Sequence, residues 1–161
     1  MITVRGFRPT RDEFEGLVTC YTTGFPEGKN RFALSRDCRQ HEDTIFVAEH
    51  HSMIVGVLMG ITKYNKAFLT GMSVLPDPRY RFGTVSMRLL IALGERYAQI
   101  GFSEAEGTTN RGAMIGIARA CGATLVKESE DHYYDGKDKL LYRADVRALG
   151  RLKMLVPPFL E

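Results

Sequence analysis

Apolar and polar residues recur with two different periods along this chain, and the changes of period predict the order of its elements. Residues 2–8 alternate as in a short strand. Thr10 and Glu13 then form a capping-box pair, which predicts the start of a helix with one apolar face. A second, mostly polar helix is expected over 31–40. The chain is therefore predicted to open with a strand and two helices.

Strongly apolar runs follow over 44–48, 53–61 and 67–75. The polar segments between them, 49–52 and 64–66, are short enough to be hairpin turns. This part of the chain is predicted to be an antiparallel meander of three strands.

The second half of the chain alternates between helical and strand patterns. The expected elements are a helix over 84–99, a strand over 102–106, a helix that begins near Asn110 and ends at Gly122, and strands over 125–128 and 140–144. Because no repeat or composition break interrupts this order, residues 1–149 are predicted to be one domain. Residues 150–161 form an apolar C-terminal extension beyond it.

Composition narrows the class of protein only a little. The chain has 161 residues and a net charge of +3, which is typical of a globular domain and does not indicate a nucleic-acid partner. The cysteines Cys20, Cys38 and Cys121 lack the Cys-x-x-Cys spacing of a zinc or redox site. The N-terminus lacks a signal-peptide pattern, and no segment has the apolar length of a membrane span. We therefore expect a cytoplasmic protein without a membrane segment.

A basic loop between the strand over 67–75 and the helix over 84–99 is the most informative local feature. The first turn of a helix leaves backbone N–H groups without partners, and the helix dipole favours negative charge there. Arg79 and Arg81 lie beside this turn in the sequence. The arrangement predicts an anion site of the kind that binds a diphosphate.

The register of this loop resembles the Arg/Gln-x-x-Gly-x-Gly/Ala cofactor loop of the Gcn5-related N-acetyltransferases, the GNAT superfamily. Arg81 takes the basic position, Thr84 the first glycine and Ser86 the second small residue. The segment 110–123 resembles the family's helix that starts with Asn and ends in a Gly-Phe pair, here Gly-Ala. The order of predicted elements from residue 2 to residue 145 is also similar to that family.

The resemblance implies an α+β fold with αβα layers, in which helices cover both faces of a mixed, mostly antiparallel sheet. It implies transfer of an acetyl group from acetyl-CoA to a primary amine on a small molecule, a protein or a tRNA. The resemblance also implies which residues bind the cofactor. The backbone of Met72, Ser73 and Val74 would hydrogen-bond the pantetheine. The pyrophosphate would be held by Arg81, Phe82, Gly83, Thr84, Val85 and Ser86, and Asn110 would make a further cofactor contact. Asn110 also has the simpler interpretation of a helix cap.

Two departures from the family pattern keep a second interpretation open. Thr84 replaces a glycine where the backbone closely approaches a pyrophosphate, and Ile117 occupies the region where the family often has a tyrosine. A non-catalytic binding or assembly module with the same fold is the alternative to an enzyme.

Acetyl transfer to an amine needs a base for the ammonium proton and an acid for the departing thiolate. Candidates for the base are Glu49, Glu104 and Glu106, and candidates for the acid are Tyr133, Tyr134 and Cys121. Each also has a structural interpretation, as a solvated strand end, a half-buried tyrosine or the last member of an apolar stripe. His50 and His51 are predicted to lie in a hairpin turn and not to reach one site together, so no metal site is expected.

The acceptor and the C-terminal extension are open questions in the sequence. Basic residues over 11–41 suit an acceptor with negative groups, whereas acidic residues over 128–135 suit a polyamine. The apolar residues of 150–161 predict a contact with protein, either with their own domain or, slightly favoured, with a second subunit in a homodimer. Pro157 and Pro158 favour an extended arm.

Overall fold

The computed structural model describes residues 1–109, 112–129 and 139–154. Its strands are β1 (Thr3–Gly6), β2 (Ile45–His50), β3 (Met53–Lys63), β4 (Lys66–Val74), β5 (Glu104–Thr109), β6 (Thr124–Ser129) and β7 (Lys139–Asp145). Its helices are α1 (Arg11–Gly24), α2 (Arg31–Gln40), α3 (Phe82–Gln99), α4 (Gly112–Ala120) and α5 (Val146–Leu149), with short 3₁₀ turns η1 (Glu42–Thr44) and η2 (Gly150–Met154).

The strands form one seven-stranded sheet in the order β1-β2-β3-β4-β5-β7-β6. Neighbouring strands in this sheet are antiparallel, except that β4 and β5 are parallel. A parallel pair needs a crossover connection, and α3 provides it. The predicted mixed, mostly antiparallel sheet is confirmed.

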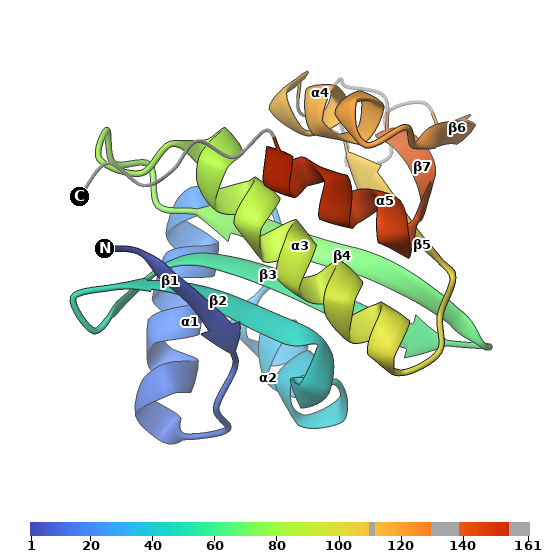
Figure 1. Ribbon diagram of the computed structural model, residues 1–161. Helices are drawn as coiled ribbons and strands as arrows, with labels where there is room; N and C mark the ends of the chain where they lie inside the picture. The colour runs from blue at the N-terminus through green and yellow to red at the C-terminus, as the bar shows by residue number, and fades with distance from the viewer. Residues whose placement is uncertain (110–111, 130–138, 155–161) are drawn as a thin grey trace.

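Helices cover both faces of the sheet (Figure 1). On one face, α1 and α2 bury Leu17, Tyr21 and Leu34 against the strands. On the other face, α3 buries Leu89 and Leu93 in a second core that also takes in residues of α4 and α5. Each helix presents an apolar stripe to the sheet, so the layered α+β arrangement follows from the helical period of the sequence.

The beginning of the C-terminal segment packs on its own domain. Leu152 of η2 is fully buried in the core that contains α3, and Lys153 Nζ lies 2.5 Å from a carboxylate oxygen of Glu95 on α3. Residues 150–154 thus continue the domain rather than leave it as an arm. Residues 155–161, with Pro157 and Pro158, lie outside the described residues, and the homodimer contact stays a prediction.

Within the described residues, no helix is long and apolar enough to cross a membrane.

Candidate functional site

The parallel strands β4 and β5 pair over only a short distance. Ala67–Leu69 of β4 pair with Ala105–Gly107 of β5, and the register stops there. Gly60 of β3 pairs with Leu69 and Met59 pairs with Gly71, so Thr70 is an extra, bulged residue in β4. Beyond the bulge β4 stays with β3, while β5 stays with β7. The two strands therefore separate and leave what we call the β4–β5 gap.

Alternation along β4 decides which backbone groups face this gap. The Leu75 N–H donates to the Val55 carbonyl of β3 at 2.9 Å. In an antiparallel pair such bonded positions alternate, so the backbone groups of Ser73 also face β3, while those of Met72 and Val74 face the gap. The Ser73 side chain is equally engaged, because its hydroxyl lies 3.1 Å from the Cys20 carbonyl and 3.2 Å from the Tyr21 carbonyl. Of the three predicted pantetheine contacts, Met72 and Val74 are placed for the role and Ser73 is turned away.

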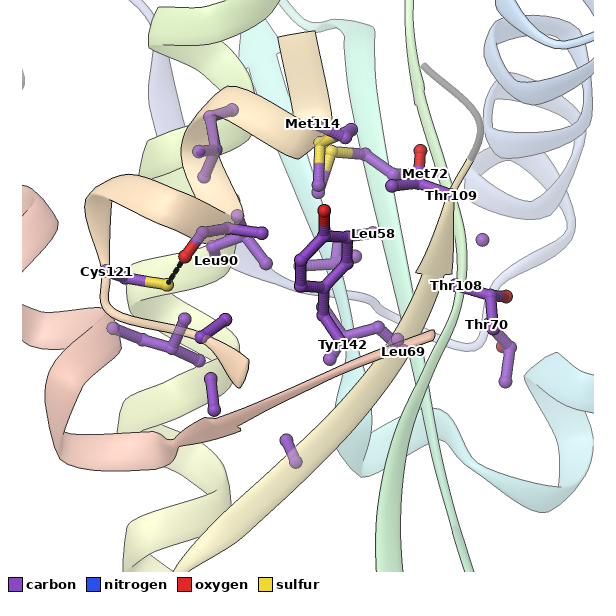
Figure 2. Close-up of a pocket in the computed structure, with 18 of the residues that line it drawn as sticks. Leu58, Leu69, Thr70, Met72, Leu90, Thr108, Thr109, Met114, Cys121 and Tyr142 are labelled. Atoms are coloured by element: carbon purple, nitrogen blue, oxygen red, sulfur yellow. Dashed lines mark hydrogen bonds between the residues drawn. The ribbon is translucent and has the colours of Figure 1, made fainter. Parts of the chain in front are cut away.

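A largely apolar cavity of about 130 Å³ occupies the gap and continues under α3 and α4. Met72 and Thr109 line it at the separated ends of β4 and β5, and Met114 and Ile117 line it from α4. Figure 2 shows Met72, Thr109 and Met114 around a central tyrosine, Tyr142. The cavity is thus built between strands and helices that hold it from opposite sides.

The first turn of α3 lies at the end of β4 and is open to an anion. Arg81 occupies the N-cap position without a side-chain hydrogen bond, and no acidic residue lies in this turn. The first intrahelical bond runs from the Val85 N–H to the Arg81 carbonyl at 3.0 Å, so the N–H groups of Phe82, Gly83 and Thr84 precede it. A Cβ atom added to Gly83 would meet no atom within 4 Å. The structure therefore has the predicted features of a phosphate-binding helix terminus.

The later residues of the predicted loop turn inward. Val85 and Ser86 are buried, and the Ser86 hydroxyl has no hydrogen-bond partner among the described residues. A ligand at the surface of this turn would reach the Arg81 to Thr84 part first.

The two arginines of the loop differ in how their charge is used. The Arg79 guanidinium binds both carboxylate oxygens of Asp77, at 2.7–3.2 Å, and this contact lowers the pKa of Asp77 to about 2. Arg81 is exposed and has no ion-pair partner in the part of the chain that the structure describes. Among the described residues, Arg81 is therefore the arginine of this loop whose charge is not used in an ion pair.

The predicted bases are held in ion pairs. Glu49 of β2 accepts hydrogen bonds from Arg5, which also binds Glu13 of α1 at 2.6 Å, and it does not line the cavity. Glu106 of β5 accepts from Arg143 Nε at 3.0 Å and from its Nη2 at 2.7 Å. Glu106 is next to Gly107, where the gap closes, but its side chain does not line the cavity either, because alternation along β5 turns it away from the face of Ala105 and Gly107. It lines a separate pocket together with Arg143.

Of the predicted acids, the structure describes only Cys121. This thiol lines the cavity and donates to the Ala118 carbonyl at 3.3 Å. Burial raises the pKa of the Cys121 thiol. Tyr133 and Tyr134, like the cofactor candidate Asn110, lie outside the described residues.

Sequence reasoning missed Tyr142. This residue of β7 is 8% exposed and lines the cavity. Its hydroxyl points into the gap between Met72 and Met114 (Figure 2). The alternating pattern of β7, which puts Tyr142 and Ala144 on one face, was the available signal. The pattern could not show that the face of β7 with Tyr142 lines the β4–β5 gap.

An ion pair supports the bulge from the opposite side. Lys29, in the loop between α1 and α2, donates to Asp37 Oδ2 at 2.5 Å and to Thr70 Oγ1 at 2.8 Å. Asp37 is 5% exposed. The bulged residue of β4 is thus tied to α2, although Lys29 was expected only as a basic group on the acceptor side.

His50 ends β2 and His51 begins the β2–β3 turn, with their rings side by side. The rings of His50 and His51 have centroids 4.1 Å apart, because both His51 and Ser52 adopt left-handed backbone conformations in a tight turn. Among the described residues, no group of three or more His, Cys, Asp or Glu side chains could hold a metal ion.

Comparison with solved structures identifies the fold. The ribosomal-protein-S18-alanine N-acetyltransferase from Escherichia coli aligns with a TM-score of 0.77 and 14% identity, over 91% of this chain and 94% of that chain. Ard1 from Thermoplasma volcanium aligns with a TM-score of 0.77 and 18% identity, over 89% of this chain and 97% of that chain. The aminoglycoside 6'-N-acetyltransferase from Enterococcus faecium aligns with a TM-score of 0.74 and 12% identity, over 89% of this chain and 97% of that chain. The chain has the GNAT fold.

At the level of sequence, this GNAT-fold chain matches no protein-family model and no curated protein. The likeness therefore lies in the arrangement of its elements, and the chemistry must be argued from its own side chains. Its α4 presents Ile117 to the cavity, where the family resemblance implies a tyrosine, and Tyr142 enters from β7 instead.

The ion pair at the bulge is expected to stabilise the GNAT fold. Within the described residues, Lys29→Met leaves the buried Asp37 with Arg36 as its remaining ion-pair partner, 3.3 Å away and half exposed. We expect a loss of about 2 kcal/mol in unfolding free energy, below the roughly 3–5 kcal/mol of a completely broken buried pair. Urea unfolding followed by circular dichroism measures it.

Lys153→Met is the matched control, because the Lys153–Glu95 pair is exposed. Its expected cost is below about 1 kcal/mol. Equal effects of the two substitutions would contradict the assigned role of Lys29.

Proposed function

We propose that this chain is an N-acetyltransferase that moves the acetyl group of acetyl-CoA to a primary amine. The acceptor is a small molecule or an amine on a protein or tRNA. The observation that carries the proposal is that the β4–β5 gap leads to an uncapped helix terminus with a free arginine.

The residues present fit such a cofactor. Backbone groups of Met72 and Val74 face the gap and could pair with an extended amide-containing arm as a neighbouring strand would. The N–H groups of Phe82 to Thr84, with the Arg81 guanidinium, suit its diphosphate. Bound acetyl-CoA would supply the acetyl group as a thioester. The solved NatC complex, bound to a Gag peptide and CoA, has a similar fold at a TM-score of 0.76 and 11% identity.

Tyr142 is the group we assign to protonate the departing thiolate. It brings a hydroxyl into the cavity, whereas the α4 residues that line the cavity, Met114, Ile117 and Ala118, carry no ionisable group. Tyr133 stays a second candidate for this role. On the acceptor side, Glu106 is the favoured base, since it lies beside the point where β4 and β5 separate. Its bond to Arg143 orients the carboxylate.

A non-catalytic module stays the second candidate. Thr84 at the helix terminus and Tyr142 in the middle of the gap both reduce the space for a cofactor. Binding of CoA separates the two candidates, because a module that has lost the cofactor gives no heat on titration.

The first test is isothermal titration with acetyl-CoA. Arg81→Glu should weaken binding at least about tenfold, because a charge-assisted bond to phosphate is lost and a like charge replaces it. Arg11→Glu makes the same charge change on exposed α1 and should leave the dissociation constant within about twofold. Unchanged binding in the folded Arg81 variant would remove the diphosphate assignment.

A second test addresses the acid. Tyr142→Phe removes the hydroxyl and keeps the ring, so release of CoA in the presence of a panel of primary amines should slow about 100-fold. The affinity for acetyl-CoA should change little. Tyr64→Phe, at an exposed turn, is the control. Full activity in the Tyr142 variant would transfer the acid role to another group.

A further inference from the structure

The cavity does not end where the gap closes. The last paired residues of β4 and β5 are Leu69 and Gly107, yet the cavity is also lined by Ala105, which pairs with Ala67 two residues deeper. Ala144 of β7 and Leu149 of α5 line the same deep part. We call this part, lined by Leu69, Leu90, Ala105, Cys121, Ala144 and Leu149, the acyl chamber.

The direction of the proposed cofactor leads into the acyl chamber. A diphosphate at the N-terminus of α3 lies at the Val74 end of β4. An arm that follows Val74 and then Met72 reaches the bulge at Thr70. Any group carried beyond the end of that arm meets Leu69 and Gly107 next, at the entrance to the acyl chamber.

The walls of the acyl chamber are apolar and uncharged. Ala105, Cys121 and Leu149 are each less than 5% exposed. The one thiol is already bonded to the Ala118 carbonyl, and burial keeps it protonated by raising the pKa of Cys121. Small side chains at 105 and 144, with glycine at 107, leave space that larger residues would fill.

We propose that the acyl chamber accepts an aliphatic acyl group longer than acetyl, so that propionyl-CoA and butyryl-CoA bind more tightly than acetyl-CoA. This inference rests on the proposed function. The whole cavity, the β4–β5 gap included, measures about 130 Å³, and the acyl chamber is the part of it beyond the end of the arm. Its apolar lining favours added methylene groups and disfavours an acyl group that ends in a carboxylate.

The test is titration of the protein with CoA and with acetyl-, propionyl-, butyryl- and succinyl-CoA. Each methylene buried in an apolar site contributes about 0.8 kcal/mol, so the dissociation constant should fall about fourfold per carbon from acetyl to butyryl. Succinyl-CoA should bind more weakly than butyryl-CoA.

Gly107→Ala places a methyl group at the entrance to the acyl chamber. An added Cβ would lie 3.4 Å from the Leu69 side chain, an ordinary contact, so the fold should tolerate it. The preference for butyryl-CoA over acetyl-CoA should fall at least threefold. Gly116→Ala, where an added Cβ meets nothing within 4 Å, is the control and should leave the preference unchanged.

The outcomes distinguish the two proposals. If acetyl-CoA binds and the longer acyl groups bind equally or more weakly, the acyl chamber has no such role and the proposed acetyltransfer stands. If neither CoA nor any acyl-CoA binds, both proposals are overturned.

Discussion

The separation of β4 from β5 is the constraint on which the rest of this structure depends. Backbone N–H and C=O groups in a folded protein need partners. Beyond Leu69 and Gly107, each strand keeps its other neighbour but loses this one. At Met72 and Val74, β4 therefore has no neighbouring strand on the side of the gap, and this edge could serve the proposed extended ligand. The N-terminus of α3, which follows β4 in the chain, would add the positive charge of Arg81 and of the helix dipole for the proposed diphosphate.

Contacts on both faces of the sheet fix β4 near the point where it separates from β5. Below the sheet, Lys29 joins the bulged Thr70 to the buried Asp37 of α2. Above it, α3 packs on β3 so closely that a Cβ atom at Gly60 would lie 2.3 Å from the Tyr97 hydroxyl. That hydroxyl donates to the Phe68 carbonyl at 2.7 Å, beside the last paired residues. The gap is thus bounded by rigid packing rather than by a loop.

Local sequence signals predicted much of the fold but not its tertiary details. The helix expected over 31–40 has those bounds in the structure, because Asn30 caps it and its period is regular. The strand expected over 102–106 is found at Glu104–Thr109 instead. The apolar residue Phe102 precedes the strand, and its ring packs on Tyr97, with ring centroids 5.8 Å apart. The polar residues Thr108 and Thr109 become strand through their pairing with β7.

The site shows the same division. The uncapped terminus of α3 could be predicted, since it depends on a strand, a loop and a helix that are adjacent in the sequence. Ser73, Glu49 and Tyr142 could not be assigned correctly, because their surroundings come from α1, β1 and the gap, which only the folded chain brings near. In each case the sequence identifies the chemical group, and the sheet decides which way it faces.

The most direct measurement is a crystal structure of the protein with CoA. The account predicts the pantetheine in the β4–β5 gap, hydrogen-bonded to Met72 and Val74, with the diphosphate on the N–H groups of Phe82 to Thr84. The ring of Tyr142 should turn aside to make room. CoA bound elsewhere, with the gap still filled by Tyr142, would contradict it.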